Sequence, residues 1–326
     1  MSGVPHGGDL ADAAALAGTP ADDWLDLSTG INPHAYPATI SPGSLARLPQ
    51  RVALDALLAA ARAAYAVPAE AAIVAAPGTQ ALIQWLPHLL APERVTILAP
   101  TYAEHAAAWR RRVPTAEADG LPQTGLAVVV NPNNPTGTVL PREAIAQAAG
   151  RAPRGGVGVV VDEAFGDVAP ATSVAGMPGT LVLKSFGKFF GLAGVRLGFA
   201  IGAPEVVQPL AEALGPWAVG GPALEIGAAA LADRTWIAAM RARLAHERAA
   251  LDAVLAGAGL AVIGGTDLFR LVATPDAAGL HRALARHGIW TRRFETEPEW
   301  LRFGLPGAAL PRLAASLAAI TADARP

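Results

Sequence analysis

The chain of 326 residues contains no cysteine. This absence excludes disulfide bonds, thiolate nucleophiles and metal sites built on cysteine. Long apolar runs are also missing, because glycine, proline or a charged residue interrupts each run before the roughly 20 residues that a membrane helix needs. The seven histidines show no spacing typical of metal ligands. We therefore expect an enzyme without a metal ion and without a membrane partner.

Charge is balanced rather than concentrated in one sign, and the formal net charge is −2. A chain of this kind has no general attraction to nucleic acid or to an anionic membrane, so neither is expected as a partner. The first residues lack a basic stretch and contain Asp9 and Asp12, which argues against a signal peptide. Together with the absence of cysteine, this predicts a cytoplasmic location.

Lysine is nearly absent as well. Only Lys184 and Lys188 occur, four positions apart, and all other Lys or Arg positions are arginine. Arginine stays protonated at physiological pH, whereas a lysine amine can lose its proton and act as a nucleophile. A deprotonated lysine is what a covalent bond to an aldehyde cofactor requires. The segment around the two lysines is therefore the first candidate for chemistry.

Short apolar runs bounded by glycine or proline predict buried strands, and stretches of helical length and periodicity separate the earlier ones. The expected strands are Ala72–Ala76, Val95–Ala99, Leu126–Val130, Val157–Val161, Leu181–Leu183 and Leu197–Ile201, and the expected helices are 52–66, 79–91, 103–113 and 141–151. Alternation of this kind predicts an α/β fold with a mainly parallel sheet flanked by helices.

The pattern changes after Pro222. Residues 223–257 read as almost wholly helical, and mixed strands and helices follow, which indicates a smaller α+β domain. We predict three parts: an N-terminal segment at the site entrance (1–35), a large domain (36–222) and a small C-terminal domain (223–326).

Polar residues stand just after several expected strands, where an open α/β sheet delivers side chains into one crevice. These residues are Gly78-Thr79-Gln80, Tyr102, Asn134 within Asn131-Pro-Asn-Asn-Pro-Thr-Gly137, Asp162 within Asp-Glu-Ala, and Lys188 within Gly-Lys-Phe-Phe-Gly-Leu-Ala-Gly-Val-Arg196. In this order and spacing, the motifs resemble those of pyridoxal-phosphate enzymes of the class I/II aminotransferase family, with the aspartate-aminotransferase fold (fold type I). The resemblance covers nearly the whole chain. It is strongest to the branch of histidinol-phosphate aminotransferases and threonine-phosphate decarboxylases.

The resemblance implies pyridoxal 5'-phosphate as cofactor and assigns its ligands. Lys188 would bond to the cofactor aldehyde, Asp162 would hold the pyridine nitrogen protonated, and Tyr102 would stack on the ring. The remaining implied ligands are Asn134 for the ring 3'-oxygen, and Ser185, Arg196 and the N–H groups at Gly78, Thr79 and Gln80 for the phosphate. Lys188, Asp162 and Tyr102 are the expected catalytic residues.

The N-terminal segments His6-Gly7-Gly8-Asp9 and Ser28-Thr-Gly-Ile-Asn32-Pro33 resemble those of the decarboxylases. The substrate contacts that the resemblance implies are His6, Gly7, Asn32, Asn134, Arg292 and Arg302. Arg302 would take the substrate carboxylate, for which a planar fork is suited. The implied reaction converts L-threonine O-3-phosphate to (R)-1-amino-2-propanol O-2-phosphate and CO₂, a step of cobalamin biosynthesis.

Two positions depart from the aminotransferase pattern. Phe165 stands where aminotransferases of this group carry a tyrosine, and this favours decarboxylation. Leu48, in Arg-Leu-Pro-Gln, replaces a tyrosine that reaches the neighbour's cofactor in the expected homodimer. The alternatives are an aminotransferase of the histidinol-phosphate type and a non-catalytic assembly subunit. Four further residues, for which structural roles or packing are the expectation, are Lys184, Glu163, His105 and Trp217.

Overall fold

The computed structural model describes residues 6–17, 24–152 and 155–323 of the chain. The described residues form two compact units. Unit 1 comprises Ala35–Ala238, and unit 2 comprises the described residues up to His34 together with those from Ala239 onward. Helix α10 (Arg234–Gly257) runs through the boundary between Ala238 and Ala239.

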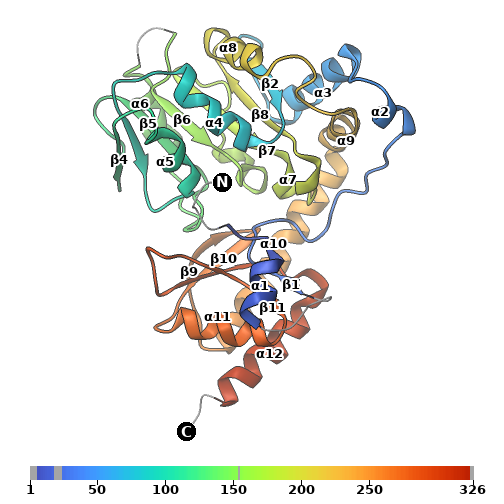
Figure 1. The fold of residues 1–326 in the computed structure, drawn as a ribbon, viewed down its shortest axis with the longest axis vertical. Coiled ribbons are helices and arrows are strands. Elements are labelled where there is room, and N and C mark those ends of the chain that lie inside the picture. The colour runs from blue at the N-terminus through green and yellow to red at the C-terminus, as the bar shows by residue number, and fades with distance from the viewer. Residues whose placement is uncertain (1–5, 18–23, 153–154, 324–326) are drawn as a thin grey trace. The chain divides into compact units, whose positions relative to one another are not determined.

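Unit 1 is built on a seven-stranded sheet with the strand order β2-β8-β7-β6-β5-β3-β4 (Figure 1). Its strands are β2 (Ala72–Ala76), β3 (Val95–Leu98), β4 (Thr115–Ala118), β5 (Leu126–Val130), β6 (Val159–Asp162), β7 (Thr180–Ser185) and β8 (Gly198–Gly202). All neighbouring pairs are parallel except the two that β8 forms, with β2 and with β7. The central strands β5 and β6 are buried along their whole length, as expected for a sheet covered on both faces.

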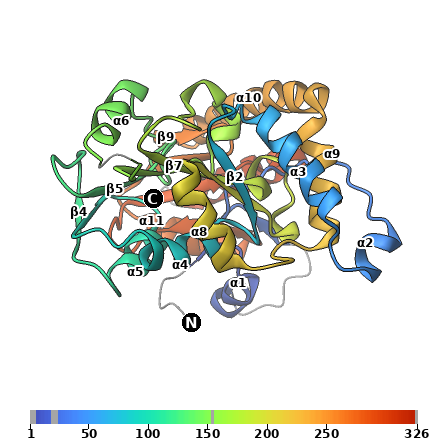
Figure 2. The same cartoon turned by 90° about the horizontal axis from the view of Figure 1, so that it is seen from above.

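Helices cover both faces of this sheet. Figure 2 shows α4, α5 and α8 on one side and α6 on the other. The helices of unit 1 are α2 (Pro42–Ala46), α3 (Arg51–Ala64), α4 (Thr79–Leu89), α5 (Ala103–Trp109), α6 (Arg142–Ala149), α7 (Phe186–Phe189), α8 (Pro204–Leu214) and α9 (Gly221–Ala232), with 3₁₀ turns η1 (Gly166–Val168), η2 (Pro170–Thr172) and η3 (Ala193–Val195). Apolar side chains of α4, α5 and α8 pack with the sheet into one core that includes Leu82, Trp109 and Leu210.

Unit 2 contains a four-stranded antiparallel sheet of order β12-β13-β10-β9 and a parallel pair of short strands, β1 and β11. Its elements are α1 (Leu10–Ala17), β1 (Leu25–Asp26), β9 (Ala261–Thr266), β10 (Phe269–Ala273), α11 (Ala277–Arg286), β11 (Ile289–Trp290), β12 (Arg292–Arg293), β13 (Trp300–Gly304), η4 (Gly307–Ala309) and α12 (Leu310–Asp323). The pairing of β1 with β11 joins N-terminal residues to the C-terminal part of the chain.

The predicted α/β fold with a mainly parallel sheet and a smaller α+β part is confirmed. The helical run predicted for 223–257 is interrupted at Asp233, whose carboxylate accepts a hydrogen bond from the backbone N–H of Trp236 (2.9 Å). Asp233 thereby caps the first turn of α10, which explains the break. The boundary that the sequence places after Pro222 differs from the division within α10, because α9 packs against α3 inside unit 1. The position of residues 1–35 at a site entrance stays a prediction.

No helix within the described residues is both long enough and apolar enough to cross a membrane.

Candidate active site

Three strand ends of unit 1 meet at one point and bring Ser185 close to the start of α4. Gly198, the first residue of β8, is in register with Ala76 at the end of β2 and with Ser185 at the end of β7. A Cβ atom on Gly198 would lie only 2.7 Å from the backbone nitrogen of Thr79. Glycine is therefore required here, and its absent side chain lets β8 approach the first turn of α4.

Arg196 lies at the same point. Its backbone is left-handed (φ 55°), and a Cβ atom on Gly78 would come within 2.8 Å of its Nη2 atom. Gly78 precedes α4 with φ 82°, a conformation that glycine adopts without strain. The first N–H groups of a helix have no partner within the helix and carry partial positive charge. The guanidinium of Arg196 beside them makes a cradle that fits the phosphate of the expected cofactor.

Gln80 and Tyr102 are also brought together. The Tyr102 hydroxyl donates to Oε1 of Gln80 (3.3 Å), and Nε2 of Gln80 donates to Oε2 of Glu104 (2.7 Å). Glu104 is buried on α5. Tyr102 occupies the N-cap position directly before this helix. This hydrogen-bonded chain fixes the position of the Tyr102 ring relative to α4.

Asn134 lies in the loop after β5, and this loop is joined to the loop that carries Tyr102. Oγ1 of Thr101 donates to Oδ1 of Asn133 (2.6 Å), and Nδ2 of Asn133 donates to the carbonyl oxygen of Pro100 (2.9 Å). Two of the predicted ring contacts therefore come from loops that hold each other in place.

Asp162 ends β6 and is almost fully buried. Its Oδ1 atom accepts from the backbone N–H of Ala164 (3.0 Å), and its Oδ2 atom accepts from Nε2 of His105 (2.9 Å). Because a carboxylate can only accept, the His105 tautomer in this contact carries its proton on Nε2. His105, for which the sequence predicts packing alone, is fully buried and also orients the predicted cofactor acid. Its place one helical turn after Tyr102 is the signal that sequence reasoning missed.

Lys188 lies in α7, and its Nζ atom is 5.9 Å from the ring centroid of Phe165. Phe165 is buried and follows the strand that ends in Asp162. The fold therefore places the predicted catalytic lysine next to the residue that replaces the aminotransferase tyrosine. A phenyl ring offers an apolar face to the amine but no hydroxyl group.

Lys184 occupies a different environment from Lys188. Its Nζ atom is 2.5 Å from Oε2 of Glu163, and both side chains are buried. Glu163 also accepts hydrogen bonds from the Ser173 hydroxyl (2.6 Å) and the Val174 backbone N–H (2.7 Å). The structural role expected for both residues agrees with this ion pair. For Trp217 the expectation of packing in the core is wrong, because this residue is 59% exposed.

In unit 2, Arg302 contacts the N-terminal segment that contains predicted substrate residues. The Arg302 side chain donates from Nη2 to the backbone oxygen of Ser28 (2.6 Å). The Ser28 hydroxyl accepts from the backbone N–H of Gly8 (2.8 Å), and a Cβ atom on Gly7 would lie 2.5 Å from the oxygen of Ser28. Gly7 and Gly8 are thus held against Ser28, which Arg302 contacts.

Asn32 is buried in the same unit, and its Oδ1 atom accepts from the backbone N–H of His34 (2.8 Å). His34 in turn is held by Glu247, whose carboxylate oxygens lie 2.7 and 2.9 Å from Nε2 of His34. These contacts fix the loop that presents the Asn32 amide.

Arg292 and Arg302 stand directly opposite each other on the antiparallel strands β12 and β13. Side chains in register on neighbouring strands point to the same face of the sheet. Burial, aided by the positive charge of Arg292 and opposed by the carboxylate of Asp26, lowers the pKa of Arg302 to about 9. Two guanidinium groups that stand opposite each other, one of them buried, favour a bound anion.

The structure therefore brings the predicted residues together in two sets. Unit 1 holds the set predicted for the cofactor, namely Gly78, Thr79, Gln80, Tyr102, Asn134, Asp162, Ser185, Lys188 and Arg196. Unit 2 holds the set predicted for the substrate, namely His6, Gly7, Asn32, Arg292 and Arg302. The roles of these residues stay predictions.

A sheet of this order, with an anion cradle, a buried carboxylate and a lysine at its strand ends, defines a class of cofactor-dependent enzymes of the α/β type. Residues 23–317 match the family described as Aminotransferase class I and II. The chain belongs to this family.

Relatives of known name extend over nearly the whole chain. It is 47% identical to a threonine-phosphate decarboxylase of Sinorhizobium sp (94% of this chain, 95% of the relative). It is 46% identical to the threonine-phosphate decarboxylase of Pseudomonas aeruginosa (96% and 97%). A histidinol-phosphate aminotransferase of Aeromonas hydrophila is 30% identical (84% and 83%).

Among solved structures, the fold is similar to that of histidinol-phosphate aminotransferase from Sinorhizobium meliloti in complex with pyridoxal-5'-phosphate. The TM-score is 0.82 at 20% sequence identity, and the match covers 99% of this chain and 96% of the other.

Proposed function

We propose that this protein is a pyridoxal-phosphate-dependent lyase that decarboxylates L-threonine O-3-phosphate. The products are (R)-1-amino-2-propanol O-2-phosphate and CO₂, and the reaction belongs to cobalamin biosynthesis. The observation that carries the proposal is the 46–47% identity, over nearly full length, to two proteins named threonine-phosphate decarboxylase.

The residues of unit 1 fit the cofactor. Arg196, Ser185 and the first N–H groups of α4 would hold the phosphate, and Lys188 would anchor the cofactor covalently. Asp162 would keep the pyridine nitrogen protonated, and His105 supports this by fixing the carboxylate with a 2.9 Å hydrogen bond. When bound, pyridoxal phosphate supplies an electron sink for the bond that breaks at the substrate carbon.

The residues of unit 2 would bind and orient the substrate. Arg302 would hold the carboxylate, and Arg292, His6, the Gly7 N–H and the Asn32 amide would serve the substrate phosphate. The carbon–carbon bond to the carboxylate breaks, CO₂ leaves, and the substrate carbon gains one proton. An enzyme of this class selects the bond that breaks by fixing the substrate orientation, so the contacts to the carboxylate and to the phosphate would decide which bond breaks.

The second candidate is transamination of the histidinol-phosphate type. It is suggested by the relative at 30% identity, and the fold is compatible with it. Phe165 argues against it. Its ring lies 5.9 Å from the Nζ atom of Lys188 and provides no hydroxyl donor at this position.

Product analysis separates the two reactions. The purified protein, loaded with pyridoxal phosphate, is incubated with L-threonine phosphate in the absence of any oxo acid, and released CO₂ is measured. We expect stoichiometric CO₂ and aminopropanol phosphate. Turnover that appears only with histidinol phosphate and 2-oxoglutarate refutes the decarboxylase. A protein that binds the cofactor without turning over either substrate supports the remaining alternative, a non-catalytic assembly subunit.

We further propose a homodimer. Four large apolar side chains within one stretch of unit 1 are at least half exposed, which is unusual for a monomer's surface. They are Ile40, Leu45, Leu48 and Val52. Size-exclusion chromatography with light scattering should give twice the chain mass, and Val52→Asp with Leu45→Asp should give monomers. The cytoplasmic location stays a prediction from the sequence.

A further inference from the structure

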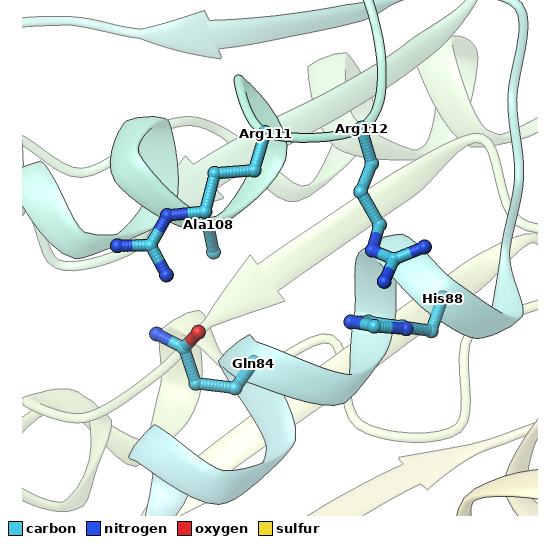
Figure 3. A pocket seen from close by; sticks show the side chains of 5 residues that line it. All are labelled: Gln84, His88, Ala108, Arg111 and Arg112. Atoms are coloured by element: carbon cyan, nitrogen blue, oxygen red, sulfur yellow. The ribbon is translucent and has the colours of Figure 1, made fainter.

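A cleft of about 610 Å³ opens in unit 1, and none of its lining residues is assigned to the cofactor. It is lined by Gln84 and His88 of α4, Ala108 of α5, and Arg111 and Arg112 of the turn that follows α5. In Figure 3, Arg111 and Gln84 reach into the opening from one side, and Arg112 and His88 from the other. The buried Ala108 leaves room between them because its side chain is a single methyl group.

The charge of this cleft is unbalanced. No carboxylate lines it, and among the described residues neither Arg111 nor Arg112 forms an ion pair. The preceding residue behaves differently, because Arg110 pairs with the carboxylate of Glu117. Two exposed guanidinium groups therefore line one cavity and form no ion pair among the described residues, whereas the neighbouring Arg110 is paired with Glu117.

The lining groups define the chemistry of a ligand. A guanidinium binds phosphate or carboxylate oxygens through two parallel hydrogen bonds, and the His88 ring adds a further donor. The Gln84 amide nitrogen donates to Oε2 of Glu104 (3.4 Å). The volume lies in the range of small-molecule pockets. Two arginines line the cavity in a chain of net charge −2, which does not match the extended basic surface that nucleic acid requires. We propose that the cleft binds a small doubly charged anion of the phosphate-monoester class.

The test uses the holoenzyme, so that bound cofactor already fills its own phosphate cradle. Binding of inorganic phosphate is measured by isothermal titration calorimetry, with chloride at matched ionic strength as the reference. Wild-type protein is compared with Arg111→Ala/Arg112→Ala. The matched control is Arg110→Ala, which removes an exposed arginine of the same turn without touching the cleft.

We expect the double variant to bind one phosphate fewer per chain, or to bind it about tenfold or more weakly, since hydrogen bonds to charged groups are lost. Arg110→Ala should bind as the wild type does. Equal stoichiometry and affinity in wild type and double variant overturn the proposal. So does a double variant that differs from wild type only in retention on single-stranded RNA, because this would indicate a nucleic-acid surface. Both arginines are exposed, so the variant is expected to fold, and circular dichroism verifies this.

Discussion

The buried ion pair of Lys184 and Glu163 leads to a prediction about stability. The prediction distinguishes the structural role of Lys184 from the catalytic role proposed for Lys188. Replacing Lys184 by Met removes the cation and leaves the Glu163 carboxylate buried without its counter-charge. Breaking a buried pair on one side costs about 3–5 kcal/mol. Glu163 keeps the hydrogen bonds from Ser173 and Val174, so we expect the lower end, about 3 kcal/mol.

Lys184→Arg keeps the charge but enlarges a side chain that has little space. The Lys184 Nζ atom lies 4.9 Å from the Tyr65 ring centroid, and even a Cβ atom on Gly166 would stand 3.3 Å from it. Overpacking of this kind costs about 1–3 kcal/mol. The expected order of stability is therefore wild type, then Lys184→Arg, then Lys184→Met. The double variant Lys184→Met/Glu163→Gln should lose less than the sum of the single losses, because the two sites interact directly.

Urea denaturation followed by circular dichroism measures these differences, and a loss of 3 kcal/mol lowers the midpoint by about 1 M or more. The folded variants should keep the visible absorption of the lysine-bound cofactor. Wild-type stability in Lys184→Met refutes the ion-pair argument. Loss of cofactor absorption in Lys184→Arg means that the catalytic lysine has been assigned to the wrong residue.

Three further predictions concern the site and the pH dependence of folding. Lys188→Ala should lose the cofactor absorption and at least about 1,000-fold of CO₂ release, while its urea midpoint stays near that of wild type. His105→Phe removes the 2.9 Å hydrogen bond to Asp162 and should lower kcat/KM about 10–100-fold with the cofactor still bound to lysine; unchanged kinetics would assign His105 to packing alone. Burial, aided by the charges of Arg293 and Arg282, lowers the pKa of His281 to about 4, so the unfolded chain takes up this proton first and stability falls as pH drops from 6.5 toward 4. With a reduction for solvent screening, the loss is roughly 2 kcal/mol, and urea midpoints at pH 7 and pH 5 should differ less in His281→Gln.

The periodicity of the sequence predicts the strands of unit 1 well, because buried parallel strands are short runs of valine, isoleucine and leucine. The direction of β8 does not follow from such a run. Only the register shows that Gly198 faces both Ala76 and Ser185, and that the antiparallel course brings Arg196 to the start of α4. The motif spacing indicates that these residues belong together, whereas the sheet order explains how they meet.

Side-chain partners were harder to predict than strands. The contact of His105 with Asp162 joins residues 57 positions apart, so no local pattern contains it. Arg292 and Arg293 are adjacent, and strand alternation turns only one of them to the face of Arg302. The register of β12 with β13 places Arg292 opposite Arg302 and Arg293 opposite Leu301. Trp217 was expected to be packed but is exposed, because an apolar residue type alone does not establish burial.

The N-terminal segment of unit 2 has a consequence for how the chain is made. The hydrogen bond between Arg302 and Ser28 spans 274 positions, and β1 pairs with β11 from the far end of the sequence. A ribosome adds about 5–20 residues per second, so roughly 15 to 55 seconds pass between the two partners. During this time Leu27, fully buried in the finished protein, has none of its final neighbours from β13. The described residues of unit 1 are all synthesised before unit 2 can close, and the described residues before Ala35 wait for partners from the far end of the chain.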